Sequence, residues 1–131
     1  MGYAPALVRS GFRPLDGARW LEREGHARLA GLVAHHTGAR LEAEELGLLE
    51  AIDRFADEAS AVSDALACSD LTTGPAGERI TVAQRLAEIE WRYGSASGVV
   101  RALQRASQSL SAMVERTELR LARAASDQRV A

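Results

Sequence analysis

The sequence predicts an all-α fold: a bundle of about six helices with a long C-terminal helix. Apolar residues make up 47% of the chain and aromatic residues only 5%, with alanine and leucine abundant, which favours packed helices over a sheet. Apolar side chains also recur every three or four residues along most of the chain. Because 131 residues suffice for a buried core, we expect a single domain over residues 1–125 and a frayed tail over 126–131.

Capping residues and glycine breaks set the expected helix boundaries. Pro14 suits the first turn of the first helix, and Gly25 and Gly38 end the first two helices. Thr81 and Gln84 form a capping-box pattern, a hydroxyl three residues before a glutamine, which begins a later helix. The expected helices are 15–23, 26–36, 42–55, 60–69, 81–93 and 99–125.

The last expected helix carries a narrow apolar stripe, which suits either the flank of a bundle or one partner of a coiled-coil pair. Arginines on the same helix could form a second stripe, but Glu115 and Glu118 interrupt it. We therefore interpret that side of the helix as a solvated face. The apolar stripe consists of Val99, Leu103, Ala106, Leu110, Met113, Thr117 and Leu121.

Charge and composition argue against several classes of partner. The net charge of −2 gives no electrostatic reason to expect a nucleic acid or an anionic membrane. The longest apolar run near the middle, residues 29–34, is too short to cross a bilayer. The N-terminal region shows no basic segment followed by an apolar stretch, the pattern of a secretory signal. The single cysteine, Cys68, excludes an internal disulfide. We therefore expect a cytoplasmic protein.

Two adjacent histidines and one aspartate make a candidate divalent-metal site. His35 and His36 end the second expected helix, and Asp70 lies near the end of the fourth. Imidazole nitrogens and carboxylate oxygens suit Mn, Fe, Co, Ni or Zn. Successive helical residues differ by about 100° in direction, so both histidines can face one metal only at a frayed helix end, or they serve two neighbouring metals. The alternative is one core histidine bonded to the backbone and one exposed histidine.

Four short segments share the pattern of a known family. They are Gly2–Pro5, Arg13–Ala18, His35–Gly38 and Asp70–Pro75. In this order and at these separations they resemble the HD-domain superfamily of metal-dependent phosphohydrolases, over roughly residues 1–73, with 80–125 as accessory helices. The resemblance implies that His35 and His36 match the family's His-His pair and that Asp70 matches its late aspartate, so that all three bind the metal.

The chain departs from the family pattern at its start. The family's His-Asp pair would fall immediately before Gly2, its first histidine would lie earlier still, and Arg13 occupies the place of the histidine in a His-Pro-x-x-Gly element. Two explanations stay open. Either Met1 is an internal methionine of a longer protein with the full site, or the chain is complete and its site is degenerate. The abrupt apolar start favours the first.

The resemblance implies hydrolysis of a phosphomonoester or phosphodiester, with a phosphorylated small molecule or nucleotide as substrate and a divalent metal, Mg included, that activates a water. Arg13 is then a candidate substrate-binding residue, because guanidinium binds phosphate in a bidentate way. The alternative is a solvent-facing or glutamate-paired arginine. Without the His-Asp pair, we expect this chain to be inactive or nearly so. The alternative function is a non-catalytic helical module that forms a homodimer.

Three other conspicuous residues have structural interpretations. Asp64 lies well around its helix from Asp70, six residues later, so we expect it to cap the helix or to pair with an arginine. Trp20 and Trp91 are better explained by packing than by stacking on a ligand.

Overall fold

The fold is all-helical, as the sequence predicts. The computed structural model describes residues 5–129, and this part of the chain contains seven α-helices, two short 3₁₀ helices and no β-strand. None of these helices is both long and apolar enough to cross a membrane. Residues 1–4, which include most of the first family-like segment, and the last two residues of the expected tail lie outside the described range. The elements are η1 (Pro5–Leu7), α1 (Arg13–Arg23), α2 (Ala27–His35), η2 (His36–Gly38), α3 (Ala39–Glu45), α4 (Leu49–Ile52), α5 (Ala61–Thr72), α6 (Val82–Tyr93) and α7 (Gly98–Asp127).

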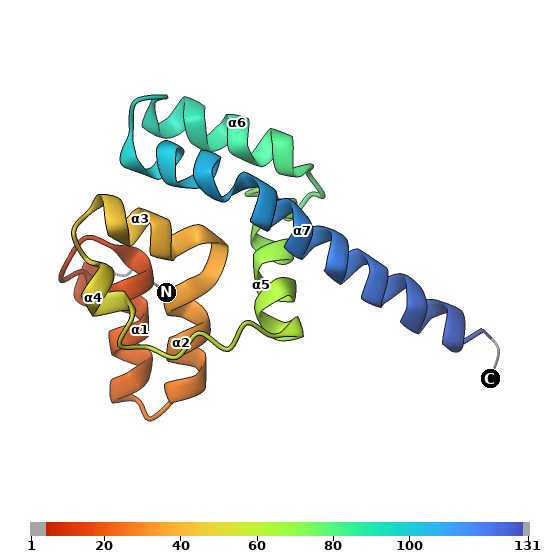
Figure 1. Cartoon of the computed structure of the whole chain (residues 1–131), viewed down its shortest axis with the longest axis horizontal. Coiled ribbons are helices and arrows are strands. Elements are labelled where there is room, and N and C mark those ends of the chain that lie inside the picture. The colour runs from red at the N-terminus through yellow and green to blue at the C-terminus, as the bar shows by residue number, and fades with distance from the viewer. Residues whose placement is uncertain (1–4, 130–131) are drawn as a thin grey trace.

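Two hydrophobic clusters divide the helices between them. The first joins α1 to α4, with Leu15, Ala34 and Ile52 fully buried. The second joins α5, α6 and α7 around Leu71 and Leu110. Figure 1 shows the corresponding arrangement, with α1 to α4 on one side and α5 to α7 on the other. Contacts of α3 with α7, and of η2 with both α5 and α7, connect the two groups.

Most helices begin and end within a few residues of their expected boundaries, and the capping box of Thr81 and Gln84 is confirmed. The exception is the third expected helix, which is divided into α3 and α4. Between them Gly47 has a left-handed backbone with a φ of 69°, a conformation that ends an α-helix. The expected frayed tail needs a correction too, because α7 continues to Asp127.

The long helix α7 is only partly covered by the bundle. Its apolar stripe is buried at Leu103, Ala106, Leu110 and Thr117. The helix then continues past the other elements (Figure 1), and Leu121, the last residue of the stripe, is 64% exposed. The stripe therefore flanks the bundle along most of its length and loses its cover near the C-terminal end.

The two tryptophans differ in their surroundings. Trp20 packs against the first hydrophobic cluster, as expected. Trp91, near the end of α6, is 87% exposed, so the packing interpretation is wrong for this residue. Its side of α6 faces solvent, while Leu86 and Ile89 of the same helix pack against the second cluster.

A close contact fixes α2 against the segment that leads to α5. Gly31 lies in α2, and a Cβ at this position would lie 2.3 Å from the carbonyl oxygen of Ala56. Only glycine leaves room for such an approach of two backbones. One turn later on α2, His35 contacts the same segment, because its Nε2 lies 2.9 Å from the carbonyl oxygen of Phe55. The glycine therefore helps to place the first of the two histidines.

We expect the substitution Gly31→Ala to lower the free energy of unfolding by about 1–3 kcal/mol, because the new methyl group overlaps the Ala56 carbonyl. The matched control is Gly98→Ala in the first turn of α7, where the nearest atom to a new Cβ would lie at 3.5 Å. This control should lose no stability, since alanine favours helices more than glycine does. Urea denaturation followed by circular dichroism measures both variants, and equal stabilities would contradict the close contact.

Candidate functional site

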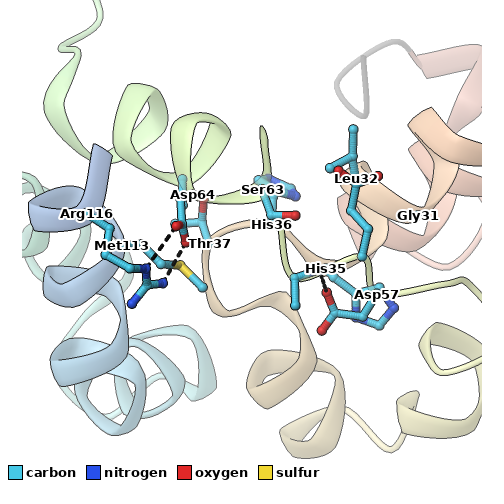
Figure 2. A pocket seen from close by; sticks show the side chains of 13 residues that line it. Gly31, Leu32, His35, His36, Thr37, Asp57, Ser63, Asp64, Met113 and Arg116 are labelled. Carbon is cyan, nitrogen blue, oxygen red and sulfur yellow. Dashed lines mark hydrogen bonds and ion pairs between the residues drawn. The ribbon is translucent and has the colours of Figure 1, made fainter. Parts of the chain in front are cut away.

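A pocket of about 120 Å³ lies where the two hydrophobic clusters meet. One wall comes from the end of α2, from η2 and from residues 57–59, and the other comes from α5 and α7 (Figure 2). The polar residues that line it include His35, His36, Thr37, Ser63, Asp64 and Arg116.

One ring nitrogen of each histidine is hydrogen-bonded to a backbone carbonyl oxygen. Nε2 of His35 lies 2.9 Å from the Phe55 oxygen, and Nδ1 of His36 lies 2.6 Å from the Val33 oxygen. A carbonyl oxygen only accepts hydrogen bonds, so these two nitrogens carry the proton. In the neutral rings the lone pair is then on Nδ1 of His35 and on Nε2 of His36. Nδ1 of His35 is buried and has no hydrogen-bond partner in the described part of the chain.

Both histidines are half-buried. The backbone bonds fit the core histidine of the structural alternative, but neither ring is fully buried and neither is exposed. The break between α2 and η2 explains how two adjacent residues reach the same pocket. His35 ends α2, and the backbone of His36 is extended, with a φ of −68° and a ψ of 149°. The helix therefore ends between the two histidines, and both line the pocket.

Two residues that line this pocket have a left-handed backbone conformation. Thr37 has a φ of 48° and a ψ of 45°, and Ala59 has a φ of 43°. They are the two non-glycine residues with positive φ within residues 5–129, and both line the pocket. Such conformations cost about 1 kcal/mol or more and concentrate at functional sites. The hydroxyl oxygen of Thr37 is also buried without a hydrogen-bond partner among the described residues.

Asp64 is buried in the pocket wall and accepts hydrogen bonds from two arginines of α7. Its Oδ1 accepts from Nη2 of Arg116 at 2.6 Å, and its Oδ2 accepts from Nε of Arg116 at 2.9 Å and from Nη1 of Arg120 at 2.6 Å. The bonds from Arg116, joined by those from Arg120, lower the pKa of Asp64 to about 2, although burial opposes this shift. The expectation that Asp64 pairs with an arginine is confirmed.

The predicted third ligand, Asp70, does not line the pocket. Its Oδ1 lies 3.5 Å from Nη2 of Arg85 on α6, and its side chain is 41% exposed. Six residues turn a helix by about 240°, so α5 presents Asp64 to the pocket and Asp70 to another side. Within residues 5–129, no group of three or more histidine, cysteine, aspartate or glutamate side chains is arranged to hold a metal. The structure thus brings His35 and His36 together at the pocket without Asp70.

The predicted substrate-binding residue, Arg13, begins α1, is exposed and does not line the pocket. Its charge acts on Glu42 of α3. Burial raises the pKa of Glu42, and the charges of Arg13 and His36 partly oppose this increase. These surroundings fit the glutamate-paired alternative for Arg13. A phosphate contact by Arg13 stays a prediction.

The sequence analysis did not identify Thr37 or Arg116, which both line the pocket, as candidate site residues. Thr37 directly follows the histidine pair, and this position is the one sequence feature that could have indicated a place for it in the site. Arg116 belongs to the arginines of α7 that we interpreted as a solvated face. Arg116 and Arg120 are exposed, as that interpretation expects, but each also contacts the buried Asp64. Their spacing of four residues places them on one side of the helix and could have indicated a shared acidic partner.

No protein-family model matches the chain, and neither a curated protein nor a solved structure matches it significantly. The family resemblance therefore rests on the sequence segments themselves.

We expect the stability of the protein to depend on pH through Asp64. The pKa of Asp64 is about 2 in the folded protein, and its ordinary value is 3.8. The contribution of Asp64 to the free energy of unfolding is therefore fully present above about pH 4 and is lost as the pH falls towards 2. The free energy of unfolding, measured by urea denaturation at a series of pH values, should fall more steeply in this window for the wild type than for Asp64→Asn.

Asp57→Asn is the control for this experiment. It removes another carboxylate from the pocket wall, one that accepts a backbone hydrogen bond from Ala59 at 3.2 Å. This variant should keep the steeper slope of the wild type. Parallel curves for the wild type and Asp64→Asn would show that the arginine contacts do not stabilise the fold.

Proposed function

We propose that this chain provides part of a divalent-metal site of the metal-dependent phosphohydrolase type, with His35 and His36 as metal ligands. One observation carries the proposal: each histidine places one ring nitrogen on a backbone carbonyl and keeps the other for a ligand. Metal-binding histidines are held in this way, because the carbonyl fixes both the ring orientation and the tautomer. The HD-domain resemblance of the surrounding segments supports the same function.

Nδ1 of His35 and Nε2 of His36 would hold the metal. When bound, a divalent metal would activate a water and polarise the phosphoryl group of a phosphorylated small molecule or nucleotide. Two histidines are fewer than the three protein ligands of typical catalytic zinc sites. Asp70, the predicted third ligand, contacts Arg85 on another side of α5, so its role as a ligand stays a prediction. We therefore expect weak metal binding and slow or no hydrolysis by this chain.

Metal binding tests this proposal directly. Isothermal titration with Mn²⁺ or Zn²⁺ should show that His35→Ala and His36→Ala each weaken binding by about tenfold or more, because each removes a ligand nitrogen. The matched control is His26→Ala, which removes an exposed histidine that does not line the pocket. Equal affinities for all three variants and the wild type, or no binding by the wild type, would contradict the proposal. Release of p-nitrophenol from p-nitrophenyl phosphate measures any remaining activity.

A second candidate function is a non-catalytic module that forms a homodimer, and the exposed end of α7 favours it. Leu121 continues the apolar stripe of this helix beyond the part that the bundle covers, and it is 64% exposed. A second copy presents the same stripe. Two-fold pairing of two α7 ends would therefore cover both copies of Leu121 with one self-complementary contact.

Sedimentation velocity over a range of concentrations tests the dimer. We expect Leu121→Glu to raise the dimer dissociation constant by about tenfold or more, since it places a charge in an apolar contact. Leu119→Glu is the matched control, because Leu119 is 58% exposed but lies about 160° around the helix from Leu121. A wild type that stays monomeric, or two variants with the same effect, would exclude this interface.

A further inference from the structure

Three carboxylates line the pocket, and they differ in their partners. The carboxylates of Asp64 and Glu58 are each paired with arginine, at 2.6 and 2.8 Å. The third carboxylate, that of Asp57, accepts one hydrogen bond, from the backbone N–H of Ala59 at 3.2 Å. No ion pair among residues 5–129 includes it. In the described part of the chain, Asp57 is therefore the pocket carboxylate that no arginine neutralises.

The charges around the pocket favour a cation. The three carboxylates outnumber the one arginine of the lining, Arg116, which is already bonded to Asp64. The charge of Asp57 also acts on Arg40, but Asp53 holds that guanidinium group through two hydrogen bonds of 2.9 Å. A cation near Asp57 would therefore meet a negative charge that is not yet compensated.

Asp57 lies on the same wall of the pocket as His35 (Figure 2). The chain just before it is attached to α2 at two points. The carbonyl oxygen of Phe55 is bonded to Nε2 of His35, and the carbonyl group of Ala56 packs closely on Gly31. These contacts hold the backbone at Asp57 beside the end of α2, while its side chain is exposed and can turn.

We propose that Asp57 supplies the carboxylate ligand of the metal site formed by His35 and His36. Two imidazole nitrogens and one carboxylate oxygen form a known ligand set of catalytic metal sites, which leaves a position open for water. The inference rests on the proposed function, because it completes the same site. It gives Asp57 the role that the sequence predicts for Asp70.

The three ligands come together only when the metal binds, because no three such side chains within residues 5–129 are already arranged to hold one. Binding therefore includes a rotation of the Asp57 side chain towards the histidines. The rotation costs little, since it breaks a single hydrogen bond of 3.2 Å. Asp70 contacts Arg85 and does not line the pocket, and a side-chain rotation does not change its position on α5.

Isothermal titration of the full chain with Mn²⁺ tests the assignment, because carboxylate oxygens are preferred ligands of this metal. Asp57→Asn removes the charge and keeps an oxygen that can accept from the N–H of Ala59. This variant should bind Mn²⁺ about tenfold or more weakly than the wild type, because it loses a charged ligand. Asp70→Asn should stay within about threefold of the wild type.

Glu58→Gln is the matched control. It makes the same change of charge at the next residue of the same wall, where Arg28 already pairs with the carboxylate. This variant should also bind Mn²⁺ within about threefold of the wild type, and urea denaturation checks that each variant is folded. Equal weakening by Asp57→Asn and Glu58→Gln would mean that only the overall negative charge of the pocket matters. That result, or unchanged binding by Asp57→Asn, would overturn the assignment.

The histidine variants separate this inference from the proposed function. If His35→Ala and His36→Ala weaken Mn²⁺ binding and Asp57→Asn does not, the histidine site stands and Asp57 is not its ligand. Weakening by Asp70→Asn in place of Asp57→Asn would return the third position to Asp70. If neither histidine variant changes the affinity, the proposed function itself is wrong.

Discussion

The turn between α2 and α3 is the constraint on which the pocket and the helix arrangement depend. His36–Gly38 changes the direction of the chain, with positive φ values of 48° at Thr37 and 75° at Gly38. This turn packs against both α5 and α7, and a Cβ on Gly38 would lie 3.2 Å from the Cβ of Ala106. The turn therefore lies between the two hydrophobic clusters and holds the histidine pair at their junction. The strain of a left-handed threonine is offset by the packing on both sides.

Arginines of α7 supply the polar contacts that attach this helix to the rest of the bundle. Arg101 lies 2.7 Å from Glu45, and Arg105 lies 2.8 Å from Glu44, but the two arginine side chains are about half exposed, and such surface pairs contribute little. The contacts to Asp64 differ because that carboxylate is buried. Loss of its arginine partners would leave a buried charge without compensation, which costs much more than loss of a surface pair. Asp64 and Arg116 both line the pocket, so this ion pair forms part of the pocket wall as well as a contact between α5 and α7.

The candidate site could be predicted from the sequence only in part. His35 and His36 were identified by their adjacency and by the glycine that ends their helix, and both line the pocket. Asp70 was identified as a ligand, yet α5 presents Asp64 to the pocket instead. The two aspartates have the same chemistry and differ in their direction around one helix. The rotation of α5 about its axis depends on packing against η2 and α7, which the spacing of residues within α5 does not record.

The sequence by itself determined the helical class, most helix boundaries and the buried stripe of α7, because capping residues, glycine breaks and apolar spacing act over one or two turns. The tertiary structure alone decided that α5 joins α6 and α7 in the second cluster, that Arg116 and Arg120 bind a buried aspartate, and that Thr37 adopts a left-handed backbone at a pocket. These features depend on contacts between residues such as Asp64 and Arg116, far apart in the chain. Their pairing depends on how whole helices rotate and approach one another, which no local pattern specifies.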